Sequence, residues 1–196
     1  MNQTASPRLS RLRRDALEYW ANPSKYLDLS SVVEYDEDCG RFLINGMSFA
    51  DALGIQRLGS GCYATVYALD DKRVLKVIKT QDTGYARYVK FCKANKTNQH
   101  LPKIYYSGVW GEKQVYILER LRECRQSDDY YSGNISADNK MISSFRSLLR
   151  GREKNPFITK DAQDLVDFLG DGDNDLHSGN FMFRGDTLVV TDPFSQ

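Results

Sequence analysis

Three polar residues near the end of the sequence have the types and the spacing that phosphoryl transfer requires. Asp175 precedes Asn180 by five residues, and Asp192 follows Asn180 by twelve. The reaction needs a carboxylate that accepts the hydroxyl proton and orients the nucleophile, while an amide oxygen and a second carboxylate hold Mg²⁺ against the phosphates. A solvated acidic turn would explain the acidic stretch 171–175, but it explains neither the asparagine nor the second aspartate.

The types of the candidate ligands favour Mg²⁺ over a softer metal. Hard oxygen ligands suit Mg²⁺, whereas zinc sites use cysteine and histidine. The chain has two histidines, and its four cysteines form no CxxC pair; they are Cys39, Cys62, Cys92 and Cys124. We therefore expect neither a zinc site nor a disulfide framework, and the cysteine usage is typical of a reducing cytosol.

A glycine-rich turn, Gly59-Ser60-Gly61, lies between the first two of a series of predicted strands. Glycine has no Cβ, so backbone N–H groups at such a turn can approach a polyphosphate closely. Ala64 occupies the place of the third glycine in a GxGxxG pattern. A strand and not a helix follows, which excludes a dinucleotide-binding motif. A plain hairpin turn and a cover for phosphates fit these residues equally well.

Lys76 lies in the third predicted strand, on the face opposite to Leu75 and Val77. It shares its own face with apolar residues, which is an unusual place for a cation unless the cation meets an anion. Lysine suits that task because it is a compact charge on a long side chain. A lysine that snorkels from the strand to water is the common alternative, and Lys79 is a second candidate for the same role.

Hydrophobic periodicity and turn residues indicate the elements that position these groups. We expect five short strands, at residues 55–58, 65–69, 74–78, 104–109 and 115–118, and a helix at 83–95 between the third and the fourth. One face of this helix would be an apolar stripe and another basic; the stripe consists of Tyr85, Tyr88, Val89 and Cys92, and the basic residues are Arg87, Lys90 and Lys93. Two further helices follow, one with an apolar stripe over 141–149 and one with Thr159 as its N-cap. A final hairpin over 181–190 would fold Asn180 and Asp192 together.

The first 54 residues give a weaker pattern. Residues 8–20 place apolar side chains at helical spacing with arginines on the other face, and Asn22-Pro23 ends this predicted helix. The helix would either pack against the protein or form a basic docking arm. Residues 30–54 are mixed, and Gly54 is expected to end a short helix.

Composition restricts the class of protein. The 196 residues are 41% hydrophobic and 27% charged, which is typical of a soluble globular chain. Lys and Arg number 27 against 26 Asp and Glu, so the formal charge is +1 and nothing global indicates a nucleic-acid partner. The chain has no run of 18 apolar residues, so no membrane span is expected.

Taken together, the motifs resemble those of a protein-kinase-like fold. The stretch LGSGCYATVY resembles its glycine-rich loop, and VLK resembles its third-strand lysine motif. The stretch YILERL resembles the segment that leads into its hinge. The stretch DLHSGN resembles the catalytic loop in the form that is shared with aminoglycoside and choline phosphotransferases. The stretch TDP resembles the metal-binding aspartate motif. More closely, residues 55–196 are similar to the early serine/threonine protein kinase of short-tailed T-odd coliphages, as RVLKV, LPKIYYSG and TDPFSQ indicate.

The resemblance implies an α+β protein with a minimal two-lobed, protein-kinase-like fold. Residues 55–118 would form an antiparallel β-sheet N-lobe, and residues 119–196 a small, truncated helical C-lobe. Residues 1–54 would be an N-terminal helical or mixed extension. Four residues follow Asp192 in this sequence, so we expect no activation segment and no control through its phosphorylation.

The resemblance also implies a role for each candidate residue. Asp175 would be the catalytic base, Asn180 and Asp192 the Mg²⁺ ligands, and Lys76 the group that holds the α- and β-phosphates of ATP. His177 takes the place of a phosphate-contacting lysine and is expected to act beside Asp175. The implied nucleotide-binding residues, the last three of them around adenine, are Gly59, Ser60, Gly61, Tyr63, Val66, Lys76, Leu118, Glu119 and Leu121.

The implied activity is ATP- and Mg²⁺-dependent phosphorylation of serine and threonine in host proteins of transcription, RNA processing or defence, in the host bacterial cytoplasm. Autophosphorylation is a further expectation, and the N-terminal extension would pack within the chain or build a homodimer. Two alternatives stay open. DLHSGN fits a small-molecule phosphotransferase equally well, and a non-catalytic pseudokinase that binds host proteins is the other. Neither nucleic acid nor membrane is an expected partner.

Three positions depart from the pattern of protein kinases. The helix after Lys76 contains no glutamate, and the nearest acid is Asp82 before it, so the usual Lys–Glu ion pair is missing or rebuilt. Asp173 stands where histidine is usual, and Pro193-Phe194 stands where Phe-Gly usually follows the metal-binding aspartate.

Overall fold

The computed structural model describes the chain in two compact units. The described residues are 33–36, 41–44, 47–48, 51, 54–61, 63–78, 82–110, 113–124, 136–150, 158–170 and 174–194. The first unit comprises Met1–Asp82 and Ile104–Arg120, and the second comprises Thr83–Lys103 and Leu121–Gln196. The predicted helix at 8–20, together with Cys62, Lys79 and Asp173, lies outside the described residues.

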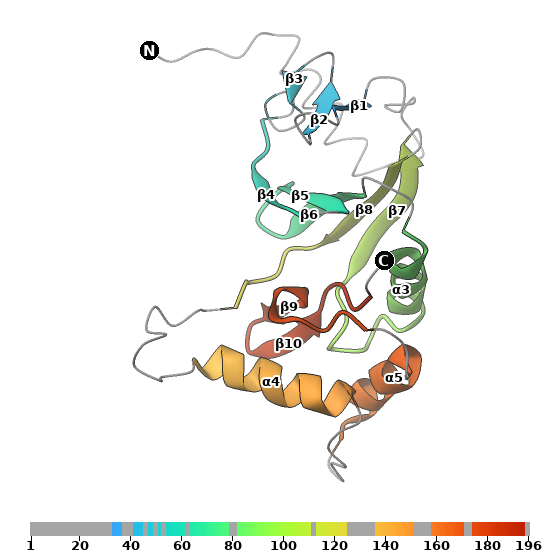
Figure 1. Ribbon diagram of the computed structural model, residues 1–196, viewed down its shortest axis with the longest axis vertical. Coiled ribbons are helices and arrows are strands. Elements are labelled where there is room, and N and C mark those ends of the chain that lie inside the picture. The colour runs from blue at the N-terminus through green and yellow to red at the C-terminus, as the bar shows by residue number, and fades with distance from the viewer. Residues whose placement is uncertain are drawn as a thin grey trace. The chain divides into compact units, whose positions relative to one another are not determined.

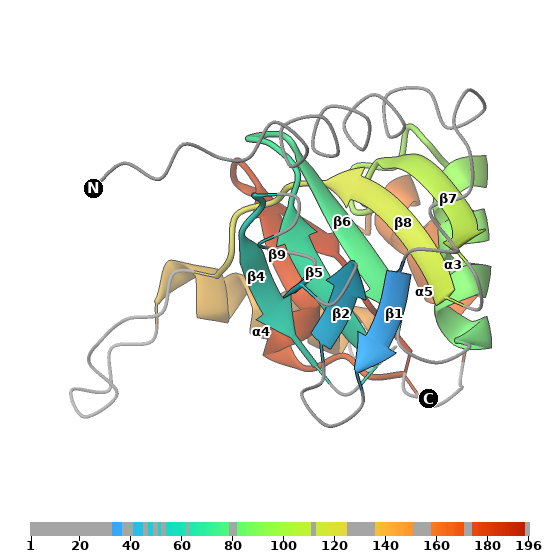
Figure 2. The ribbon, with the colours of Figure 1, turned by 90° about the horizontal axis from the view of Figure 1, so that it is seen from above.

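A five-stranded antiparallel sheet forms the main part of the first unit. Its strands are β4 (Arg57–Ser60), β5 (Ala64–Ala68), β6 (Arg73–Ile78), β7 (Ile104–Trp110) and β8 (Lys113–Glu119). They lie side by side in the order β4-β5-β6-β8-β7, as Figure 2 shows. All five strands were predicted from the sequence, and their ends differ from the prediction by at most two residues.

Strand β6 is the middle strand of this sheet and is buried on both faces. Leu75 and Val77 are buried on one face, while Val74 and Ile78 are buried on the other. The sequence of a strand that is covered on both faces is a continuous run of apolar residues, and not an alternation of apolar and polar residues. Lys76 interrupts that run and is itself buried.

A smaller antiparallel sheet precedes the main one. It consists of β1 (Val33–Asp36), β2 (Arg41–Ile44) and β3 (Met47–Ser48), in that order. The sequence had indicated only a mixed segment here, because strands of two to four residues are too short for a period to be read. Gly54 has the positive φ of 61° and donates its N–H to the Asp51 carbonyl at 3.3 Å, as expected at the end of a short helix.

The described residues of the second unit form three α-helices and a hairpin. The helices are α3 (Thr83–Ala94), α4 (Ala137–Leu149) and α5 (Lys160–Leu169), and the 3₁₀ turn η3 (Ser178–Asn180) leads into β9 (Phe181–Arg184) and β10 (Thr187–Val190). Figure 1 shows the hairpin of β9 and β10 next to α4. Both predicted helices of the second half are present, and the Thr159 hydroxyl accepts the Ala162 N–H at 3.3 Å, as an N-cap does.

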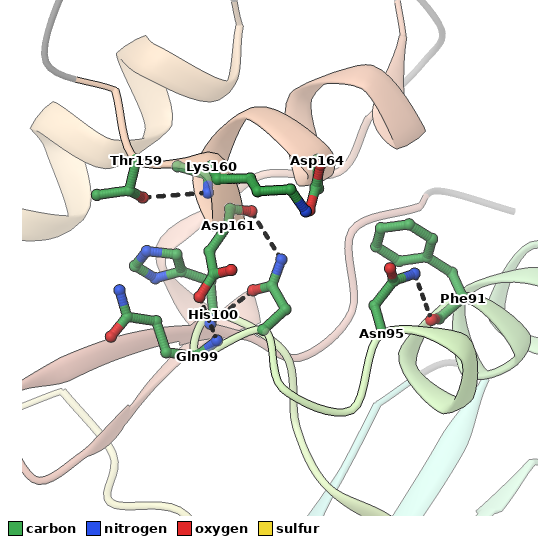
Figure 3. A network of polar contacts seen from close by, with 10 residues as sticks. Phe91, Asn95, Gln99, His100, Thr159, Lys160, Asp161 and Asp164 are labelled. Carbon is green, nitrogen blue, oxygen red and sulfur yellow. Dashed lines mark hydrogen bonds and ion pairs between the residues drawn. The ribbon is translucent and has the colours of Figure 1, made fainter.

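The loop after α3 connects this helix to α5. The Asn98 side chain donates to the Asp161 carbonyl at 2.7 Å, and the Gln99 N–H donates to the Asp161 carboxylate at 2.9 Å (Figure 3). The same loop also bonds the hairpin, because Val190 donates its N–H to the His100 carbonyl at 3.0 Å. The segment 98–100 therefore holds the start of α5 and the end of β10 together.

The buried face of α3 packs on the same hairpin. Its buried residues are Tyr85, Tyr88, Val89 and Cys92, which is the apolar stripe read from the sequence. The Tyr88 hydroxyl donates to the Val190 carbonyl at 2.6 Å. Burial first, and then the charges of Cys92, Tyr85 and Asp192, raise the pKa of Tyr88 well above its ordinary value, so this donor keeps its proton.

These elements make the protein a member of the α+β class, with an antiparallel sheet and helices in separate stretches of the chain. In the part of the chain that the structure describes, no helix is both long and apolar enough to cross a membrane.

Replacement of Tyr88 tests the bond between α3 and β10. Tyr88→Phe removes a buried hydrogen bond, so we expect the free energy of unfolding to fall by about 1–2 kcal/mol. Urea titration followed by circular dichroism measures this change. Tyr105→Phe is the control, because its side chain is exposed and its hydroxyl can bond to water. Equal stability of the two variants would contradict the structural role of the Tyr88 hydroxyl.

The turn between β5 and β6 gives a prediction on pH. The Asp70 carboxylate accepts the N–H groups of Lys72 and Arg73, both at 2.8 Å, and the Arg73 guanidinium at 2.7 Å. Partial burial raises the pKa of Asp70, but these hydrogen bonds and the Arg73 charge outweigh it, so the pKa lies below its ordinary value. The stability that Asp70 contributes is therefore present above its unfolded value of about 4 and is lost as pH falls through the lower, folded value.

We expect Asp70→Asn to melt below the wild type at pH 7 and the two melting temperatures to converge as the pH falls below about 4. Melting followed by circular dichroism from pH 7 to pH 3 checks this. A difference that stays constant over this range would show that the ionised carboxylate contributes nothing.

Candidate active site

Two backbone hydrogen bonds bring the three candidate residues of the second unit together. Asp175 donates its N–H to the Pro193 carbonyl at 2.8 Å, and Thr191 donates its N–H to the Asn180 carbonyl at 2.8 Å. These bonds join the loop 174–180 to the segment 191–194 on both sides of Asp192. An isolated bridge between Asn174 and Phe194 extends the same pairing. The hairpin thus folds Asp192 back beside Asp175 and Asn180, as its place in the sequence between Asn180 and Asp192 had predicted.

Asn180 is oriented by its own loop. Its N–H bonds the His177 carbonyl at 3.0 Å, and its side-chain amide nitrogen donates to the Asp175 carbonyl at 2.7 Å. Because the nitrogen of the amide is held in this way, the oxygen Oδ1 is the atom of Asn180 that suits a hard metal ion. The half-buried Asp192 carboxylate offers oxygen ligands from the adjoining segment.

His177 folds back over the same loop toward Asp175. Its Nε2 lies 3.6 Å from the Asp175 carboxylate, and its Nδ1 accepts the Gly179 N–H at 3.0 Å. Since Nδ1 accepts a bond, a neutral His177 carries its proton on Nε2 and presents it toward Asp175. A Cβ on Gly179 would lie 2.8 Å from the imidazole, so a larger residue here would displace the His177 ring from this position. Nothing in the sequence pattern indicated a role for Gly179.

Aromatic packing secures the residues that follow Asp192. The Arg87 guanidinium of α3 lies 4.5 Å from the centre of the Phe194 ring and 5.4 Å from that of Phe168 on α5. Phe168 also stacks on Phe91 with ring centres 3.9 Å apart. Phe194 therefore connects the segment that carries Asp192 to two helices. The sequence showed Arg87 only as part of a basic helix face, and nothing in its spacing indicated this partner.

The glycine-rich turn of the first unit joins β4 to β5. Gly59 pairs with Val66 and Ser60 with Thr65, and the Gly61 N–H donates to the Ala64 carbonyl at 2.9 Å. A Cβ built on either glycine would meet nothing within 4 Å, and neither glycine has a positive φ. Neither the backbone nor the neighbouring residues thus require glycine here. The open space above the turn fits a ligand that approaches the backbone, as a polyphosphate does.

The other candidates of the first unit lie in the middle of the sheet and at its end. Lys76 pairs with Val66 on one side and with Tyr116 on the other. Leu118 is buried and pairs with Val74, while Glu119 pairs with Arg73 at the end of β8.

The remaining two nucleotide candidates lie on the chain near these elements. Tyr63 is exposed in the glycine-rich turn, and Leu121 is half-buried where the chain enters the second unit. The roles predicted for the nucleotide-binding residues and for Asp175, Asn180 and Asp192 remain predictions.

Comparison with known proteins places this arrangement in a family. The model of the family described as Bacteriophage T7 protein kinase 0.7 matches residues 41–196. A search of curated proteins finds no significant match. The matched stretch contains every candidate site residue and begins at β2, upstream of residue 55, where the resemblance was read from the sequence. Because the match covers far more than half of the chain, this protein belongs to the bacteriophage T7 protein kinase family.

Proposed function

We propose that this phage kinase transfers the γ-phosphate of ATP, with Mg²⁺, to serine and threonine residues of host proteins in the host bacterial cytoplasm. The observation that carries the proposal is the pair of backbone hydrogen bonds on either side of Asp192, which gathers two carboxylates and one amide in a single loop cluster. That set of groups is what phosphoryl transfer needs.

Asp175 suits the role of base. Its side chain is 41% exposed, and that of His177 is 60% exposed, so a hydroxyl on another protein can reach the carboxylate. Asp175 would accept the proton of that hydroxyl and orient its oxygen. His177, whose Nε2 lies beside the carboxylate, would hold the side chain of Asp175 in place.

The donor set also fits a nucleotide with its metal. Asn180 Oδ1 and the Asp192 carboxylate are the groups that would hold Mg²⁺, which neutralises charge on the phosphates when bound. In the first unit, the open backbone of Gly59 and Gly61 would cover the phosphates, and Lys76 would bind them through its ammonium group. Leu118, Glu119 and Leu121 would surround adenine, as the family resemblance implies.

The host targets follow from the resemblance alone, and proteins of transcription, RNA processing or defence are the proposed classes. The exposure of Asp175 and His177 favours a macromolecular acceptor over a small alcohol, because a small substrate is usually enclosed by its site.

Replacement of the proposed base tests the function. Wild-type protein, ATP carrying labelled γ-phosphate and Mg²⁺ are incubated with a host-cell lysate. We expect labelled bands, including the kinase itself, with the label on serine and threonine. Asp175→Ala should lower the rate by roughly 10²–10⁴-fold, since general base catalysis contributes that much. Phosphoamino-acid analysis and band intensity give the two measurements.

Asp167→Asn is the matched control, because Asp167 is an exposed carboxylate on α5 that bonds only locally with Gln163. It should label the lysate as the wild type does. Transfer to small alcohols alone would favour the small-molecule phosphotransferase. Binding of ATP without any transfer would favour the pseudokinase.

The two proposed ligands predict a changed requirement for metal. Asn180→Ala should raise the Mg²⁺ concentration at half-maximal transfer roughly tenfold, because one oxygen ligand is lost while the Asp192 carboxylate remains. Asp192→Asn should abolish transfer at millimolar Mg²⁺. Titration of transfer against Mg²⁺ at fixed ATP measures both effects. Unchanged Mg²⁺ curves in both variants would remove these residues from the metal site.

A further inference from the structure

Two opposite charges are buried in the first unit. Among the described residues, the charged side chains with less than a tenth of their surface exposed are Lys76, at 8%, and Asp82, at 6%. A buried charge without a counter-charge is strongly unfavourable. Each of these two residues therefore needs a partner of the opposite sign or an equivalent set of polar contacts.

The register of the sheet places Asp82 on the face that carries Lys76. Lys76 lies directly opposite Tyr116 in the β6–β8 pairing, so the two side chains share a face. Gln114 precedes Tyr116 by two residues in β8 and points to that face as well. The Asp82 N–H donates to the Gln114 side-chain oxygen at 3.3 Å, which brings the chain back over this face after β6.

Tyr116 reports the position of the Asp82 carboxylate. Burial first, and then the negative charge of Asp82, raise the pKa of Tyr116 to about 12. The charge of Asp82 therefore acts on the Tyr116 hydroxyl, in agreement with the hydrogen bond from Asp82 to Gln114 on the same face of the sheet. Tyr116 is thus beside Lys76 through the strand pairing and beside Asp82 through space.

We propose that Asp82 is the counter-ion of Lys76 and acts as its positioning residue. Helix α3 carries no acidic residue, so the helix itself supplies no carboxylate for this task. Asp82, the residue directly before the helix, supplies it instead. The catalytic consequence rests on the proposed function, since Lys76 is the group expected to bind the phosphates.

The first experiment measures the reactivity of the Lys76 amine in the nucleotide-free protein. An amine-acylating reagent is added in excess between pH 6 and pH 11, and acylation of Lys76 is followed by mass spectrometry. Tyr116 and Asp82 are the titratable groups that the described contacts place beside this amine. In Asp82→Asn the buried ammonium loses its counter-charge, so the half-reaction pH should fall by about one unit or more.

Asp82→Glu should restore at least half of that shift, because it keeps the charge. Asp70→Asn is the matched control, since it removes a carboxylate from the same sheet at the β5–β6 turn and should leave Lys76 reactivity unchanged. A folded Asp82→Asn protein whose Lys76 reacts as in the wild type would overturn the proposal.

A second measurement covers the case in which Asp82→Asn does not fold. Lys76→Met leaves the Asp82 carboxylate buried without its partner and should lower the melting temperature. Lys76→Met combined with Asp82→Asn should then melt higher than Lys76→Met alone, because the unpaired charge is gone. A double variant that melts lower than Lys76→Met would show that the two side chains are not coupled.

Kinase assays separate this inference from the proposed function. Asp82→Asn should lower kcat/KM for ATP about tenfold or more, with partial rescue in Asp82→Glu and no loss in Asp70→Asn. A shift in Lys76 reactivity in a protein that transfers no phosphate supports the ion pair and overturns the proposed function. If the wild type transfers phosphate but Asp82→Asn leaves the reactivity of Lys76 unchanged, the ion pair is overturned and the proposed function is not.

Discussion

The candidate site of the second unit depends on two backbone hydrogen bonds, from Asp175 to Pro193 and from Thr191 to Asn180. Backbone groups are present whatever the side chains are, so this pairing does not use the side chains of Asp175, Asn180 and Asp192. The turn at Gly185, with its positive φ of 60°, reverses the chain between the two bonded segments. The backbone pairing and the hairpin thus bring the three residues together, and the bond from the Asn180 side chain to the Asp175 carbonyl adds to the arrangement.

A hairpin with strands of four residues is marginal on its own and needs support from other elements. Helix α3 gives that support through Tyr88, which bonds the Val190 carbonyl two residues before Asp192. Beyond Asp192, Phe194 packs against Arg87 of the same helix. One helix thus holds the metal-ligand candidate from both sides along the chain, which explains why its buried stripe is aromatic as well as aliphatic.

Local sequence predicted the elements whose signals are local. The strands of the main sheet, the Thr159 cap, the buried stripe of α3 and the closing hairpin all follow from periodicity and turn residues within short windows. Strands β1 to β3 were not predicted, because they are too short for the hydrophobic pattern to show a period. The bond between Asp82 and Gln114 joins residues 32 positions apart, and it could be found only once the strand register was known. The close approach of Gly179 to the His177 ring likewise depends on where that ring lies.

The candidate groups are divided between the two units, and this division bears on the reaction. The glycine-rich turn and Lys76 belong to the first unit, while Asp175, Asn180 and Asp192 belong to the second. The chemistry of the first set suits phosphates, and that of the second suits a hydroxyl and a metal ion. The chain passes between the units after Asp82, Lys103 and Arg120. Asp82, the residue before the first of these crossings, is the one that we propose as counter-ion of Lys76.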